Sequence, residues 1–256
     1  MHLATAPGPD RAAAIAVARR AVDLGVTLID TAHLYGWGAN EELLAEALYP
    51  YPDELLIATK VGVAPPDPPR EAAICGRPDL LRDQVEQALR RLRVERLDLL
   101  QLHRVDPEVP LADQVGTLRD LRTAGKIRHI GLSEVSAGQL AEARRTVEIA
   151  SVQNRYNVLD REHEPVLAAC DAAGIAFLPW RPVHPAVTSA EIAAIAGELG
   201  ATAAQVSLAW LLARSPVVLP IPGTTSIEHL EQNVAAADLR LTTDQMARLS
   251  GAAGPR

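Results

Sequence analysis

The chain has 256 residues, a formal net charge of -7 and 48% hydrophobic residues, enough for one domain with a sizeable core. The acidic balance and the lack of a basic run argue against nucleic acid or an anionic membrane as a partner. No apolar run approaches the ~18 residues that span a bilayer, and the amino terminus lacks a basic-then-apolar signal pattern. We therefore expect a cytoplasmic protein with a single domain over residues 1–256.

Cysteine and histidine patterns indicate neither a disulfide framework nor a metal site. The two cysteines, Cys75 in a proline-flanked loop and Cys170 in an expected helix, are interpreted as free thiols. Metal-ligand spacing is missing among His2, His33, His129, His163, His184 and His229. We expect no metal.

Strand-like apolar runs alternate with helical patterns, which favours parallel βαβ units. In the first part of the chain we expect strands at 27–32, 55–61, 97–103 and 127–133, and only a stub at 2–5. The helices expected there are 10–24 with Asp10 as its N-cap, 40–48, 78–92, 111–123 and one capped by Ser136. A proline-rich loop at 64–78 is either a substrate-side lid or a flexible spacer.

The second part of the chain continues the alternation. We expect strands at 151–156, 175–180 and 217–221, and helices at 162–173, 189–199, 202–213 and from near Ser226 onward. Seven strands and a stub predict an α/β fold, a (β/α)8 TIM barrel with the N-terminal hairpin and part of the first strand missing. Either the barrel floor lacks its usual plug or the given sequence begins late, and the sequence does not decide between these alternatives.

Three expected strands end in residues that could share one site. Asp30 and Tyr35 follow the first, Lys60 closes the second and His103 closes the third. The carboxyl ends of the strands form the active-site face of a (β/α)8 barrel. Taken singly, each residue also fits a structural role: a rim salt bridge for Asp30 and Lys60, an aromatic packed on Trp37 for Tyr35, and a hydrogen-bonded strand end for His103.

Six fragments near the ends of these strands occur together. They are Asp30-Thr31-Ala32-His33-Leu34-Tyr35-Gly36-Trp37-Gly38-Ala39-Asn40-Glu41, Ala58-Thr59-Lys60-Val61-Gly62, Leu99-Leu100-Gln101-Leu102-His103, Gly131-Leu132-Ser133-Glu134, Gln153-Asn154-Arg155-Tyr156-Asn157 and Ile221-Pro222-Gly223-Thr224-Thr225-Ser226. In this order they make the chain resemble the aldo-keto reductase superfamily from about residue 1 to residue 243.

The resemblance implies reduction of a small aldehyde or ketone to an alcohol, or the reverse, with NADPH rather than NADH. The family's catalytic tetrad falls on Asp30, Tyr35, Lys60 and His103. Tyr35 would protonate the developing alkoxide, and Lys60, held by Asp30, would lower the pKa of the phenol. His103 would donate a hydrogen bond to the substrate oxygen.

The resemblance also assigns cofactor contacts. Ser133 and Gln153 match positions that hold the nicotinamide carboxamide, and Trp180 sits where a ring stacks on the nicotinamide. The segment before the last expected helix would hold a phosphate on helix amides; its residues are Gly223, Thr224, Thr225 and Ser226. Gln232 and Asn233 match adenine contacts. Glu134 departs from the usual asparagine, and the phosphate segment lacks the usual cation.

Two other functions compete with this one. An NADPH-binding barrel could serve as a redox-sensing or regulatory subunit without turnover, although the presence of all four tetrad residues argues against it. An unrelated barrel lyase could use Lys60 as a Schiff-base amine. We expect a monomer or a weak homo-oligomer, and substrate choice would depend on the loops over the barrel mouth.

Overall fold

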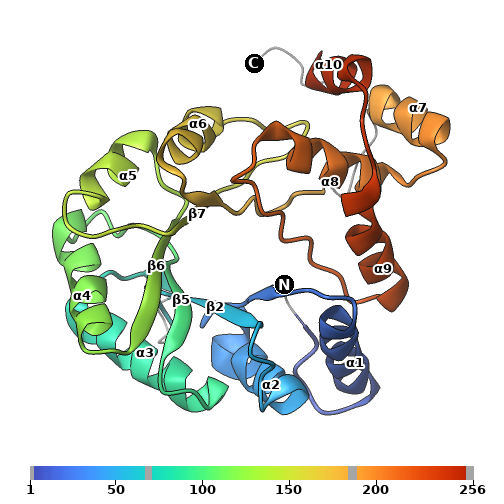
Figure 1. Ribbon diagram of the computed structural model, residues 1–256. Coiled ribbons are helices and arrows are strands. Elements are labelled where there is room, and N and C mark those ends of the chain that lie inside the picture. Colours follow the sequence, from blue (N-terminus) through green and yellow to red (C-terminus); the bar gives the residue numbers. More distant parts are fainter. Residues whose placement is uncertain (1–2, 67–70, 184–188, 252–256) are drawn as a thin grey trace. The chain divides into compact units, whose positions relative to one another are not determined.

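A computed structural model describes residues 3–66, 71–183 and 189–251 and alternates strands with helices along the chain (Figure 1). The chain forms two compact units, Met1–Val152 and Gln153–Arg256. The expected single domain over the whole chain stays a prediction.

A parallel sheet forms the centre of the first unit. Its strands lie in the order β1 (Leu28–Asp30), β2 (Leu56–Val61), β5 (Leu97–Leu102) and β6 (Ile127–Ser133). The β7 strand (Ser151–Gln153) begins in this unit and ends at the boundary. In the register, Asp30 pairs with Ala58 and Lys60 with Gln101, so the carboxyl ends of β1, β2 and β5 lie in line.

Helices and one short 3-10 turn alternate with these strands, as expected. They are α1 (Pro9–Asp23), η1 (Tyr35–Gly38), α2 (Ala39–Leu48), α3 (Pro78–Leu92), α4 (Leu111–Thr123) and α5 (Ala137–Ala143). The expected N-cap at Asp10 is wrong: Gly8 takes that place, and Asp10 lies in the first turn, where its charge suits the helix dipole. Ser136 caps α5 through a capping box with Gln139, as predicted.

Two expected features at the edges of the first unit differ from the structure. The proline-rich loop carries a short antiparallel ribbon, β3 (Val63–Ala64) with β4 (Ala73–Ile74); residues 67–70 lie outside the described residues. The expected strand stub at 2–5 is absent from residues 3–5, and His2 lies outside the described residues. The amide of Leu3 donates to the Asn40 side chain, a partner that a strand ladder does not use.

Beyond the last residue of β7, the described residues of the second unit form one short strand and more helix than expected. Its elements are β8 (Ala176–Phe177), α6 (Glu164–Ala173), α7 (Ala190–Leu199), α8 (Ala203–Arg214), α9 (Ile227–Ala235), η2 (Ala236–Asp238) and α10 (Thr243–Gly251). The strand expected at 217–221 is reduced to a single bridge between Phe177 and Val218. Pro220 and Pro222 follow directly, and proline has no amide with which to continue a ladder.

The α10 helix was not predicted, although its N-terminus carries a recognisable signal. The Gln245 amide donates to Thr242 Oγ1, and the Thr242 amide donates to Gln245 Oε1. This reciprocal pair is a capping box. Buried Leu249 then gives the helix an apolar anchor.

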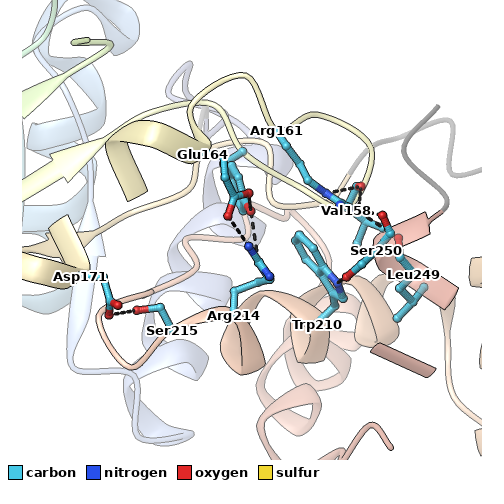
Figure 2. A network of polar contacts seen from close by, with 10 residues as sticks. Val158, Arg161, Glu164, Asp171, Trp210, Arg214, Ser215, Leu249 and Ser250 are labelled. Carbon is cyan, nitrogen blue, oxygen red and sulfur yellow. Dashed lines mark hydrogen bonds and ion pairs between the residues drawn. The ribbon is translucent and has the colours of Figure 1, made fainter. Parts of the chain in front are cut away.

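A polar network around Trp210 joins α6, α8 and α10 inside the second unit (Figure 2). Trp210 is fully buried, and the guanidinium of Arg161 lies 4.8 Å from its ring centroid. The same guanidinium donates to the carbonyls of Leu249 and Ser250, where α10 ends. Arg161 therefore acts as a cap for the last turn of α10.

In the described part of the chain, no single helix is long and apolar enough to cross a membrane. The α7 and α8 helices pass on length and composition only as a pair, and they are bent by 95° at their junction.

Candidate active site

The four side chains of the expected tetrad come together in the first unit. Nζ of Lys60 lies 2.5 Å from Oδ2 of Asp30 and 5.3 Å from the ring centroid of Tyr35. The rings of Tyr35 and His103 meet edge to face, with centroids 6.3 Å apart and planes at 86°. The sheet register explains this cluster, because Asp30, Lys60 and His103 lie at neighbouring strand ends.

The ion pair between Lys60 and Asp30 is buried, not on the rim. The side chain of Lys60 is 1% exposed and that of Asp30 is 6% exposed. Nζ also donates to the Thr31 carbonyl at 2.8 Å, and Nε2 of Gln101 donates to Asp30 Oδ1 at 3.1 Å. Burial lowers the pKa of Lys60, whereas the charge of Asp30 acts to raise it. The carboxylate therefore keeps an ammonium in a place that would otherwise favour a neutral amine.

Gln101 is a site residue to which the sequence analysis assigned no role. It stands two residues before His103 on β5, so the two side chains point to the same side of the strand. A polar amide between Leu100 and Leu102 of an expected strand was the available signal.

The expected lowering of the Tyr35 pKa is wrong in direction. Burial raises the pKa of Tyr35, the Asp30 carboxylate raises it further, and Arg104 opposes both. Asp30 is paired with Lys60, and its negative charge offsets the ammonium field at the phenol, so burial decides the sign. The phenol is therefore protonated at neutral pH and presents an O–H donor.

The imidazole of His103 is neutral at physiological pH. Burial lowers its pKa to about 3, and the charges of Lys60 and Arg104 act in the same direction. A neutral imidazole has one N–H donor and one acceptor nitrogen.

Arg104 is another site residue to which the sequence analysis assigned no role. Its Nη1 donates to the His103 carbonyl at 2.6 Å and to Ser133 Oγ at 3.2 Å. Its charge acts on the pKa of Tyr35, Lys60 and His103. Its position next to a strand-end histidine was the available signal.

The backbone after β1 carries Tyr35 on a tight coil. Gly36, Trp37 and Gly38 have φ values of 64°, 54° and 98°, three left-handed residues in succession. Such values suit glycine, and the non-glycine Trp37 adopts one only because the neighbouring turns impose it. The Tyr35 amide donates to the Ala32 carbonyl at 3.0 Å, which fixes the start of the coil.

The expected nicotinamide contacts occupy different environments in the two units. Ser133 closes β6 in the first unit, is 1% exposed and accepts from Arg104. In the second unit Gln153 is buried at the end of β7, and Trp180 is half-buried with the guanidinium of Arg181 5.8 Å from its ring centroid. Trp180 therefore keeps part of its indole accessible for stacking.

The expected phosphate segment forms the turn into α9. Ser226 is the N-cap, and its Oγ accepts from the His229 amide at 3.3 Å. Thr224 Oγ1 accepts from the Ser226 amide at 3.1 Å, which shapes the turn, while Gly223 and Thr225 are exposed. The first-turn amides of a helix point outward and favour an anion.

The two expected adenine contacts lie on α9. Gln232 donates to Glu228 Oε1 at 3.4 Å, and Asn233 is half-buried. Both side chains stand within two turns of the phosphate segment on one helix. The amides and hydroxyls of this turn, together with the side-chain amides of Gln232 and Asn233, are therefore donors of the kind that bind a nucleotide phosphate and base.

Metal-binding geometry is absent from the described residues, in which no group of three or more His, Cys, Asp or Glu side chains could hold an ion. Cys75 and Cys170 are free thiols, as predicted.

Comparison with known proteins identifies the family. The family model of the aldo/keto reductase family matches residues 1–253. The chain is 43% identical to an uncharacterized oxidoreductase of Schizosaccharomyces pombe over 94% of this chain and 79% of that protein. It is 38% identical to the pyridoxine 4-dehydrogenase of Escherichia coli over 96% of this chain and 88% of that protein.

A solved structure supports the same assignment. The aldo/keto reductase of Klebsiella pneumoniae in complex with NADP and acetate is 28% identical, with a TM-score of 0.81 over 93% of this chain and 84% of that chain. The structural neighbours confirm the (β/α)8 barrel as the fold class. The chain is an oxidoreductase that belongs to the aldo/keto reductase family.

Proposed function

We propose that the chain transfers a hydride reversibly between NADPH and a small aldehyde or ketone, with Tyr35 as the proton donor. The observation that carries the proposal is the buried cluster of Lys60, Asp30, Tyr35 and His103, with Nζ of Lys60 5.3 Å from the Tyr35 ring centroid. The Klebsiella pneumoniae relative in complex with NADP supports the choice of cofactor.

The protonation states of the cluster support reduction at neutral pH. Tyr35 holds its proton and can donate it to an oxygen that becomes negative, while the neutral His103 can donate a hydrogen bond to that oxygen. The Lys60 ammonium stabilises the phenolate left behind, and Asp30 keeps that ammonium in place. The raised pKa of Tyr35 makes it a weak acid, so its proton leaves as the alkoxide charge develops, and not before.

A bound nicotinamide would supply the hydride. Ser133, Gln153 and Trp180 would hold and orient its ring. The turn before α9, with Gly223, Thr224, Thr225 and Ser226, would take a phosphate, and Gln232 and Asn233 would contact the adenine. The turn holds hydroxyls and no lysine or arginine, so a titration that compares NADPH with NADH tests the proposed cofactor preference.

The geometry of Lys60 disfavours a Schiff-base lyase. Such an amine must be neutral and reachable, whereas Nζ of Lys60 is buried, paired with Asp30 and bonded to the Thr31 carbonyl.

The test compares the wild type with Tyr35→Phe. We expect the wild type to consume NADPH with an aromatic aldehyde and Tyr35→Phe to lose turnover by about 100-fold or more, with NADPH affinity in a fluorescence titration unchanged. Tyr49→Phe, at a half-exposed tyrosine away from the cluster, is the matched control. Equal rates for wild type and Tyr35→Phe would remove Tyr35 from the mechanism. NADPH binding without turnover in the wild type would favour a redox-sensing role, and the same titration with NADH decides the cofactor preference.

A further inference from the structure

One guanidinium, outside the tetrad, contacts the loop that carries Tyr35 and, through Glu41 of α2, is linked to the strand that carries Lys60. Arg91, near the end of α3, places Nη1 2.9 Å from Nδ1 of His33 and 3.1 Å from Oε2 of Glu41. Its Nη2 donates to Gln87 Oε1 at 2.5 Å. Neither His33, Glu41 nor Arg91 belongs to the proposed proton-transfer group.

The two partners of Arg91 lead directly to the tetrad. His33 precedes Tyr35 by two residues on the same coil. The carboxylate of Glu41 is 0% exposed, and its other oxygen, Oε1, accepts from Thr59 Oγ1 at 2.5 Å. Thr59 is the residue before Lys60 on β2. Arg91 therefore connects α3, the Tyr35 coil and β2 through three short polar contacts.

The backbone of the coil is shaped around this guanidinium. A Cβ on Gly38 would lie 2.2 Å from Cζ of Arg91, and Gly38 has a φ of 98°. A side chain at this position would strain the backbone and would push the guanidinium away from its partners. The ring of His33 also meets Trp37 edge to face, with centroids 6.0 Å apart.

The charge states agree with these contacts. A guanidinium only donates, so Nδ1 of His33 must accept and its proton must sit on Nε2. Burial and the charge of Arg91 lower the pKa of His33 to about 4, which keeps the acceptor lone pair free at neutral pH. Burial raises the pKa of Glu41, and its contacts with Thr59 and Arg91 oppose that shift. A buried carboxylate of this kind is tolerated only with such partners.

We propose that Arg91 is a positioning residue for the reaction: by holding His33 and Glu41 it sets the place of Tyr35 relative to Lys60. This inference rests on the proposed function for its kinetic consequence. Its structural part, the restraint of the coil, stands independently of whether the protein turns over.

A cavity of about 860 Å³ gives access to Arg91 from the side of α1, α2 and α3. Its lining includes Arg90 and Gln87 next to Arg91, and the side chain of Arg91 is 18% exposed. A free guanidinium ion can therefore enter the place that Arg91→Ala would vacate. Arg90→Ala is the matched control, because Arg90 is the exposed neighbour on the same helix and lines the same cavity.

The kinetic experiment measures kcat, KM and NADPH affinity in the full chain with an aromatic aldehyde. Misplacement of a reacting group by about 1 Å costs up to about 100-fold in rate, so we expect Arg91→Ala to lower kcat by about 10- to 100-fold. NADPH affinity and aldehyde KM should change by less than about threefold, because the binding groups are elsewhere. The isotope effect on kcat with deuterated cofactor should rise in Arg91→Ala, because the chemical step becomes slower. Millimolar guanidinium chloride should restore part of the kcat of Arg91→Ala. The kcat of Arg91→Lys should lie between those of the wild type and Arg91→Ala.

Hydrogen exchange of residues 31–41 provides a measurement that needs no activity. We expect faster exchange of these amides in Arg91→Ala than in wild type, and no change in Arg90→Ala. Wild-type kcat together with wild-type exchange in Arg91→Ala would overturn the proposal. If Arg91→Ala fails to fold, the same measurements on Arg91→Lys decide it. A wild type that binds NADPH without turnover would defeat the proposed function, while the exchange data would still show whether Arg91 restrains the coil.

Discussion

The ammonium of Lys60 lies 5.3 Å from the centre of the Tyr35 ring, yet the pKa of that phenol is raised. The main cause is burial of the phenol, and the charge of Asp30 adds to it. Asp30 sits 2.5 Å from Nζ of Lys60, and its charge offsets that of the ammonium, so the loss of hydration dominates at the phenol. The Lys60–Asp30 pair therefore holds a cation beside Tyr35 without lowering the pKa of the phenol.

Breaking this pair is expected to cost stability as well as rate. Lys60→Met leaves the Asp30 carboxylate buried with no cation, and removal of one partner of a buried pair costs about 3–5 kcal/mol. Urea denaturation measures the loss. Asp30→Asn combined with Lys60→Met should recover part of it, because no unpaired charge remains.

The other lysine provides the control for that prediction. Lys126 pairs with Glu86 on the surface, where the two side chains are 36% and 40% exposed. Exposed pairs contribute about 0–1 kcal/mol, so Lys126→Met should change stability by no more than that. Equal losses in Lys60→Met and Lys126→Met would contradict the assignment of a buried charge pair.

Acid is expected to destabilise the protein through two buried imidazoles. Burial lowers the pKa of His103 to about 3 and that of His33 to about 4, whereas an unfolded histidine has a pKa near ~6.5. Between about pH 6.5 and about pH 4 the unfolded chain therefore binds protons that the folded chain does not, and the free energy of unfolding falls as pH falls. Each imidazole contributes up to about 1.4 kcal/mol per pH unit in that window.

Urea titrations at several pH values check this slope. His33→Asn should reduce the pH dependence by up to one proton, and His129→Asn, at an exposed imidazole, is the control. An identical slope in wild type and His33→Asn would show that His33 does not carry the effect.

Arg161 is expected to hold the end of α10. Arg161→Ala removes the donors to the Leu249 and Ser250 carbonyls and the cation over Trp210 (Figure 2). Hydrogen bonds from a charged group contribute about 1.5–3 kcal/mol, so amides of α10 should exchange about 10- to 100-fold faster.

Arg240→Ala is the control for α10, because Arg240 donates to the carbonyls of Ala237 and Leu239 in its own segment, before the helix begins. Hydrogen exchange followed by mass spectrometry resolves the helix from the rest of the chain. Unchanged protection of α10 in Arg161→Ala would mean that apolar packing of Leu249 alone secures the helix.

Trp180 is expected to contribute to cofactor affinity. A stacked aromatic pair contributes about 0.5–1.5 kcal/mol beyond buried area, so Trp180→Ala should raise the NADPH dissociation constant by about 2- to 10-fold. Leu212→Ala, at an exposed position of α8, is the control in the same titration. A dissociation constant equal to that of the wild type would leave Trp180 a packing residue.

Several features followed from local sequence signals. Helix α4 and strand β6 have the expected bounds, and Gly174 ends α6 in a left-handed conformation. The alignment of Asp30, Lys60 and His103 followed from parallel strand ends, which depends on fold class alone. Such features are decided within a few residues or by a single topological rule.

Other features depend on contacts that the sequence does not spell out. The sign of the Tyr35 pKa shift depends on burial and on Asp30, Lys60 and Arg104 together. The strand expected at 217–221 is reduced to a bridge at Val218, because Pro220 and Pro222 have no amide to donate to a neighbouring strand. Whether a proline interrupts a strand in this way depends on which neighbouring segment would pair with it. Arg91 contacts His33 and Glu41, which precede it by 58 and 50 positions in the sequence. A local sequence pattern does not predict contacts over such separations.

The proposed proton-transfer group and its Arg91 support all fall between residues 30 and 103, within the first unit. Most of the residues proposed to hold the cofactor fall after residue 152. Under the proposed function, exchange of the segment after residue 152 between related genes would alter the nucleotide preference and leave the proton-transfer residues unchanged. Evolution could therefore adjust the choice of reductant and the chemistry of reduction as two separately heritable traits.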